Sequence, residues 1–216
     1  MKRVRATSTT TLLIAAALVA ALSGCSLSVT LPTDEPSAPT STSTPEPDSV
    51  ESPTATAEPA ALSIPGCDSL LTLDLAKSLQ GPTTVFLGES PANEYTPWFE
   101  VPAVRTAITG LTEGQSCWWG IPNSDGSFYV LVTEIDPSTR ASVESALTAE
   151  GYSTAVVGAR TVRAKEGDDD FTYRGEVHQF SGDLWILSDG ANLDISGVAA
   201  DSAFDAIDAA NPTLGL

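Results

Sequence analysis

Hydrophobic residues are distributed unevenly along this 216-residue chain, and their pattern divides it into three parts. An unbroken apolar run covers residues 12–22 (LLIAAALVAAL), and residues 26–66 then show no comparable pattern. Helical and alternating patterns begin near Cys67 and continue to the C-terminus. The pattern predicts a leader, an unstructured segment and one folded domain of about 150 residues, which is enough chain for a hydrophobic core.

Three helices are predicted in the folded part, each from an N-terminal cap residue followed by an apolar stripe. A hydroxyl or carboxylate side chain precedes each stripe, and a glycine or an Asn-Pro pair follows it. The expected caps and helices are Thr72 with residues 73–80, Asp136 with the helix that Gly151 ends, and Ser196 with residues 197–210.

Short stretches rich in β-branched and aromatic residues, separated by turn residues, predict strands. They are residues 116–122, 127–135, 152–157, 161–164, 173–180 and 184–187. We expect residues 165–170 to be a loop, and residues 98–102 to open a short helical or irregular stretch. Short turns between neighbouring strands imply an antiparallel sheet, so we predict an α+β domain whose helices cover one face of the sheet.

The leader has the features of an export signal. It starts with a basic segment, and its apolar run of 11 residues is too short to span a bilayer, which needs about 20. Leu22-Ser23-Gly24-Cys25 follows and resembles a bacterial lipobox. The resemblance implies lipidation of Cys25, cleavage before it, and anchoring on the extracytoplasmic face of the cell membrane. An ordinary signal peptide with an incidental Cys25 is the alternative.

Residues 26–66 resemble a tether. They are rich in Pro, Ser and Thr, carry six acids and no base, and contain no aromatic residue. Such a segment cannot bury enough apolar surface to offset the entropy of ordering, so we expect it to be disordered and extended. Its composition leaves both a plain spacer and an O-glycosylated stalk open.

The charge balance limits the partners. The formal net charge is −18, and three of the ten bases lie in the leader. A strongly acidic surface repels phosphate, which argues against nucleic acid and against electrostatic binding to anionic lipids. We therefore expect membrane contact through lipid on Cys25, with an envelope protein or a small ligand as the partner of the folded domain.

The chain has three cysteines, an odd number for an exported protein. Lipidation of Cys25 accounts for one of them. Cys67 and Cys117 are then the remaining pair, and we predict a disulfide between them because exported proteins meet an oxidising environment.

The sequence around these cysteines carries a family resemblance. Cys67 precedes Leu70-Leu71-Thr72 and a short helix, and Cys117 is followed two places later by Trp119. This arrangement resembles small actinobacterial cell-envelope lipoproteins of unknown function, over roughly residues 67–119 with the leader and tether. The resemblance implies a disulfide and an extracytoplasmic α+β domain, and it brings no catalytic residues.

Candidate catalytic and metal groups are few. His178, the single histidine, lies on a predicted strand, where Glu176 or Asp183 could pair with it, and no G-x-S-x-G elbow is present. Carboxylates are too numerous to single out a pair for sugar hydrolysis. The acidic stretch 166–170 lacks the spacing of a calcium loop, so whether it binds a cation stays open. We expect no catalytic residue, no metal and no cofactor.

Trp118 is the candidate binding residue. Neighbouring strand residues face opposite sides of a sheet, so if Cys117 and Trp119 point into the core, Trp118 points away. We therefore expect a non-enzymatic domain that binds a ligand or protein through Trp118, against the alternative that a helix or loop covers this side chain. An envelope enzyme acting on wall polymer or lipid through carboxylates, and an accessory subunit of a membrane complex, are the competing hypotheses.

Overall fold

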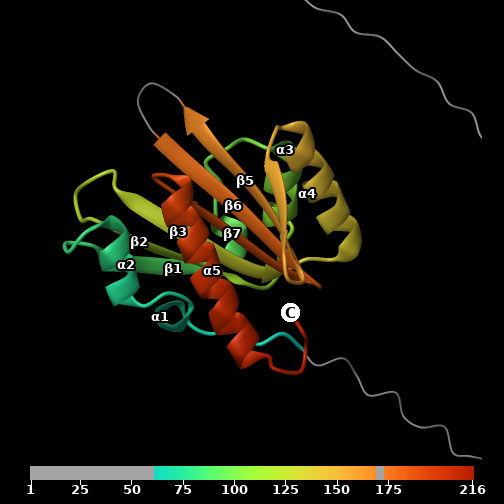
Figure 1. Ribbon diagram of the computed structural model, residues 1–216, viewed down its shortest axis with the longest axis horizontal. Helices are drawn as coiled ribbons and strands as arrows, with labels where there is room; N and C mark the ends of the chain where they lie inside the picture. The colour runs from blue at the N-terminus through green and yellow to red at the C-terminus, as the bar shows by residue number, and fades with distance from the viewer. Residues whose placement is uncertain (1–60, 169–172) are drawn as a thin grey trace, which may run out of the picture. The chain divides into compact units, whose positions relative to one another are not determined.

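Seven antiparallel strands form one sheet in the computed structural model, which describes residues 61–168 and 173–216 (Figure 1). The strands lie in the order β1-β2-β3-β7-β6-β5-β4. They are β1 (Val85–Pro91), β2 (Gln115–Gly120), β3 (Ser127–Glu134), β4 (Ser153–Val157), β5 (Arg160–Asp168), β6 (Tyr173–Ser181) and β7 (Leu184–Gly190). The predicted α+β fold with an antiparallel sheet is confirmed. Cys25 and the tether as far as residue 60 lie outside the described residues.

Helices cover both faces of this sheet, not the one face expected from the sequence. The first face carries α1 (Cys67–Leu70), α2 (Leu73–Gln80) and α5 (Leu193–Ala210); the second carries α3 (Pro102–Thr109), α4 (Pro137–Ala149) and the 3-10 helix η1 (Ala92–Glu94). The central strands β3 and β7 explain this, because they are apolar at consecutive positions. Val130 and Ile186 point to the first face, while Leu131 and Leu187 point to the second, and all four side chains are fully buried.

The first face is an apolar layer. α5 crosses the sheet in Figure 1, and its Ala199, Ala203 and Ile207 are fully buried in one core cluster with Val130 and Ile186 of the sheet. Small alanine side chains allow the helix to approach the strands closely. None of the described helices is both long and apolar enough to cross a membrane.

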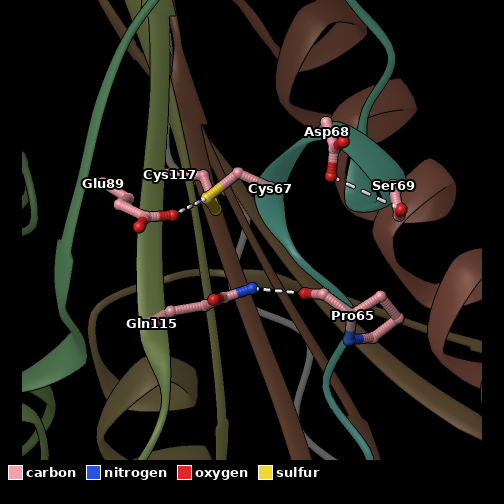
Figure 2. Close-up of a disulfide and its surroundings, with 7 residues drawn as sticks. All are labelled: Pro65, Cys67, Asp68, Ser69, Glu89, Gln115 and Cys117. Atoms are coloured by element: carbon pink, nitrogen blue, oxygen red, sulfur yellow. Dashed lines mark hydrogen bonds between the residues drawn. A yellow bond between two sulfur atoms is a disulfide. The ribbon is translucent and has the colours of Figure 1, made fainter.

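A disulfide joins α1 to β2 on the same face. Cys67 and Cys117 are bonded, with their Cα atoms 5.7 Å apart, and both are buried (Figure 2). This confirms the predicted pairing. The bond closes a loop across a sequence separation of 50 residues. In the chain-entropy account, a loop of this size contributes at most about 4 kcal/mol to stability.

The domain begins before Cys67. Residues 61–66, assigned to the tether from the sequence, pack against the domain, and Leu62 and Ile64 contact its core. The Ser63 backbone exchanges two hydrogen bonds of 2.8 Å with the Asn211 side chain. These contacts come from residues nearly 150 positions away, so no local pattern could reveal them.

Two of the three predicted caps are confirmed. The Thr72 hydroxyl accepts from the Leu75 amide at 3.3 Å, and the Asp136 carboxylate accepts from the amides of Ser138 and Thr139, both at 3.0 Å. Hydrogen bonds from these two residues also lower the pKa of Asp136.

The third predicted cap, Ser196, was wrong, because α5 begins at Leu193. Its cap is Asn192, whose side chain accepts from the Ile195 amide at 2.9 Å. Ser196 lies inside the first turn, where its hydroxyl donates to the Gly175 carbonyl of β6 at 2.7 Å. Ser196 is a good cap by composition, but contact with the sheet decides its role.

Two further expectations are corrected. Residues 165–168 continue β5 instead of starting a loop, because β6 pairs with them as far as Tyr173. β1 was missed altogether. It is an edge strand whose side chains are mostly exposed, so it lacks the alternation that marks a half-buried strand.

Candidate functional site

Trp118 and Trp119 of β2 face opposite sides of the sheet, as strand alternation predicts. Trp119 is 1% exposed; it stacks on Phe128 and belongs to the core cluster that contains the disulfide. Trp118 lies on the second face and is 38% exposed. Neither a helix nor a loop buries it, so its side chain remains accessible.

A glycine on the neighbouring strand makes room for the Trp118 ring. Gly88 pairs with Trp118 across β1 and β2, next to a register shift between Phe86 and Gly88. A Cβ atom at Gly88 would lie 2.6 Å from the indole Nε1, and the φ of +155° is unfavourable for other residues. The bulge and the glycine together let the indole lie against the β1 backbone.

The exposed indole borders a cleft of about 290 Å³, here named the aromatic cleft. Its lining residues are Glu89, Ser90, Glu94, Tyr95, Thr96, Ser116, Trp118 and Tyr129. Trp118 and Tyr129 form its aromatic wall, with ring centroids 5.4 Å apart. The side chain of Glu89 is directed at the disulfide on the other face, 3.5 Å from the Cys67 sulfur (Figure 2), so Glu94 supplies the carboxylate on the cleft side.

A buried polar network lies deeper on the same face, in β6 and β7. The Glu176 carboxylate accepts from the Tyr152 hydroxyl at 2.5 Å and from the Phe99 amide at 3.3 Å, and it lies 2.8 Å from Nε2 of His178. The indole of Trp185 donates to Nδ1 of His178 at 3.2 Å. Because Nδ1 accepts, the network places the histidine proton on Nε2, where it donates to Glu176.

A second buried carboxylate, Asp189, extends this network. Asp189 pairs with Glu176 across β6 and β7 and accepts a hydrogen bond from the Tyr95 hydroxyl. Burial raises the pKa of Asp189 to about 6; the Tyr95 hydrogen bond opposes this rise, and the nearby Glu176 adds to it. Burial and the charge of Asp189 in turn raise the pKa of Tyr95 well above its ordinary value.

Residues 95–99, here named the strap, close the network from outside. The strap is bound at the Tyr95 hydroxyl by Asp189 and at the Phe99 amide by Glu176. Glu176, which the strap contacts, and His178 beside it are completely buried. The His178–Glu176 pair considered from the sequence therefore exists, but in this conformation neither side chain is open to a substrate.

Sequence reasoning missed most of this network. Glu176 and His178 are two positions apart on one strand and so share a face, which was a readable signal. Tyr95, Tyr152 and Asp189 carried no comparable signal, because they come from distant segments.

A larger groove, of about 840 Å³, lies between α3 and the start of α4. Small, hydroxyl and aliphatic side chains line most of it, with no aromatic ring, and the carboxylate of Asp136 in its wall already caps α4. The aromatic cleft is the smaller hollow, but of the two it is the one lined by aromatic rings beside polar groups.

Metal binding gains no support from the described geometry. Within residues 61–168 and 173–216, no three or more His, Cys, Asp and Glu side chains are grouped to hold a metal ion. Of the acidic stretch 166–170, Asp169 and Asp170 lie outside the described residues.

Comparisons with known proteins place the chain in no family. No protein-family model matches it, and no curated protein is significantly similar. Among solved structures, a GTP-binding regulator from Thermotoga maritima is similar with a TM-score of 0.36 and 7% identity, over 65% of this chain and 90% of that one. So remote a likeness carries no argument about function.

Proposed function

We propose that the protein is a lipoprotein anchored on the extracytoplasmic face of the cell membrane, whose folded domain binds a ligand or an envelope protein without catalysis. The leader and the Leu22–Cys25 sequence support the anchoring. A buried disulfide in the folded domain is consistent with export, because disulfides persist in oxidising compartments.

The observation that carries the binding role is the contrast between the aromatic cleft and the buried network. The cleft opens to solvent and presents an exposed Trp118, a side chain type that gives large contact area at little entropic cost. The histidine and the two paired carboxylates, Glu176 and Asp189, are buried and hydrogen-bonded to one another or to tyrosine hydroxyls. The side chain suited to binding is therefore accessible to solvent, whereas the histidine and carboxylates of the network, which could exchange protons with a substrate, are buried.

Trp118→Ala tests the binding role. We expect this variant to lose capture of a defined partner from envelope extracts while its thermal unfolding midpoint stays close to that of the wild type. Trp98→Ala is the matched control, because Trp98 is also exposed, at 45%, but does not line the cleft. Equal capture by the wild type and the Trp118 variant would contradict the proposal. So would robust turnover of wall polymer, lipid or ester that is abolished by changing one carboxylate.

Cys25→Ser tests the anchor separately. We expect the variant to leave the membrane fraction, since two acyl chains give stable attachment and none remain. Detergent-dependent membrane fractionation of the Cys25→Ser protein would refute the lipid anchor without touching the binding role.

A further inference from the structure

We propose that the aromatic cleft binds a small organic cation, with an ammonium or guanidinium group seated against the Trp118 ring. This rests on the proposed function, because it names the chemical class of ligand for the same cleft.

The other exposed tryptophan shows how this molecule covers an indole. Trp98 is 45% exposed, and the guanidinium carbon of Arg174 lies 4.0 Å from its ring centre. Arg160 lies over Phe204 in the same way, at 4.2 Å. In the described part of the chain no lysine or arginine occupies the Trp118 ring. Trp118 is thus an exposed indole without a cation, and an aromatic face attracts one.

The charges around the cleft favour the same class of ligand. Glu94 lines the cleft, no basic residue does, and the Asp189 carboxylate lies behind Tyr95 in its wall. Four arginines are held by carboxylates elsewhere: Arg105, Arg140, Arg160 and Arg163. The fifth arginine of the described residues, Arg174, lies over Trp98, interacts with Asp189 and does not line the cleft. An anionic ligand would therefore meet Glu94 with no basic residue beside it in the cleft wall.

The size of the cleft limits the ligand to one small group. Its volume is about 290 Å³, which is near the lower end for small-molecule pockets. Hydroxyl groups of Ser90, Thr96 and Ser116 line it beside the rings and can accept hydrogen bonds from an N–H donor. One cationic head group can therefore contact an aromatic face, hydroxyl oxygens and a carboxylate together.

The experiment measures binding of two isosteric probes to the full-length protein in detergent by isothermal titration calorimetry. N-acetyl-arginine amide carries a guanidinium group, and N-acetyl-citrulline amide replaces it with a neutral urea. We expect the arginine probe to bind about tenfold more tightly than the citrulline probe, and its affinity to fall with added salt. A third probe, n-butylammonium, shows whether a cationic group alone is sufficient for binding or whether the protein also contacts the amide groups of the other two probes.

Matched variants locate the probe. We expect Trp118→Leu and Glu94→Gln each to reduce arginine-probe affinity several-fold, whereas Trp98→Leu and Glu100→Gln leave it unchanged. Glu100 is the control for charge, because it is exposed and pairs with Arg105 outside the cleft. The unfolding midpoint of each variant separates loss of binding from loss of folding.

Equal binding of the two isosteres, no binding of either cation, or unchanged affinity in Trp118→Leu would overturn the cation assignment. If the Trp118→Ala variant still loses its envelope partner in that case, the proposed function stands and only the ligand class is wrong. If partner capture is also unaffected, both fail.

Discussion

The two faces of the sheet are built on different principles. The first face, under α1, α2 and α5, is an apolar layer tied by the Cys67–Cys117 disulfide. The second face, under α3, α4 and the strap, also has an apolar cluster, but it encloses two carboxylates and a histidine and leaves an open cleft at Trp118. The first face is held by apolar packing and a covalent bond, whereas the second holds the buried carboxylates, the histidine and the open aromatic cleft.

The difference shows how a small domain can contain buried polar groups without losing its fold. An unpaired buried polar group costs about 1–3 kcal/mol, so most buried polar groups in folded proteins have a hydrogen-bond partner. Three buried side-chain atoms lack a partner in the described residues, on Gln80, Thr84 and Arg163, and none belongs to the network. The second face therefore depends on hydrogen-bond geometry, while the first depends on apolar burial and a covalent bond.

Of the changes considered for the two faces, removing the disulfide should lower the free energy of unfolding most. We expect the double variant Cys67→Ala with Cys117→Ala to lose up to about 4 kcal/mol in the free energy of unfolding, because the unfolded chain regains its loop entropy. Urea denaturation measures the loss, and reduced wild-type protein is the control. A loss below about 1 kcal/mol would mean that apolar packing alone secures the first face.

The free energy of unfolding should depend on pH because of Asp189, the buried carboxylate of the second face with a raised pKa. With its pKa raised to about 6 by burial, native Asp189 keeps its proton up to about pH 6, whereas the unfolded residue releases it near its ordinary pKa of 3.8. Between these values the native state binds more protons, so this group makes stability fall as pH rises, by about 3 kcal/mol, and the effect is complete above pH 6.

Asp189→Asn should remove that fall, and urea denaturation from pH 4 to pH 7 measures it. Asp183→Asn is the matched control, because Asp183 is exposed in the turn before β7. Identical pH profiles for the wild type and Asp189→Asn would show that this carboxylate is ionised at no cost in the native protein.

Substitutions at two glycines test the packing of the first face, and we expect them to change stability less than loss of the disulfide does. A Cβ atom at Gly175 would lie 2.3 Å from the backbone of Asn192 at the start of α5, whereas one at Gly197, inside α5, would meet nothing within 4 Å. We expect Gly175→Ala to destabilise by about 2 kcal/mol through overpacking, and Gly197→Ala to stabilise by about 0.5–1 kcal/mol through helix propensity.

Thermal and urea unfolding of both glycine variants provide the measurement. Equal effects of the two substitutions would show that the close approach of α5 to β6 contributes nothing to stability.

Local signals in the sequence were enough for much of the fold. The caps at Thr72 and Asp136, the strand pairs with short turns, and the opposite orientation of Trp118 and Trp119 all follow from neighbouring residues. The disulfide was predicted from the number of cysteines, since three cysteines with one expected to carry lipid leave one pair.

What failed were assignments that depend on distant contacts. Ser196 had the composition of a cap, but its hydroxyl bonds to β6 and Asn192 caps the helix instead. β1 was missed because its position at the sheet edge leaves its side chains exposed and without alternation.

The sequence by itself determined three of the five α-helices and six of the seven strands in the described residues, the antiparallel sheet and the disulfide, because caps, turns and side-chain periodicity act over a few residues. Only the tertiary structure decided that helices cover both faces, that Gly88 lies beside Trp118, and that Tyr95 bonds to Asp189, 94 positions away. The physical reason is that burial, strand register and hydrogen bonds between distant residues are fixed by the packed chain as a whole, and a linear pattern does not encode which distant residues meet.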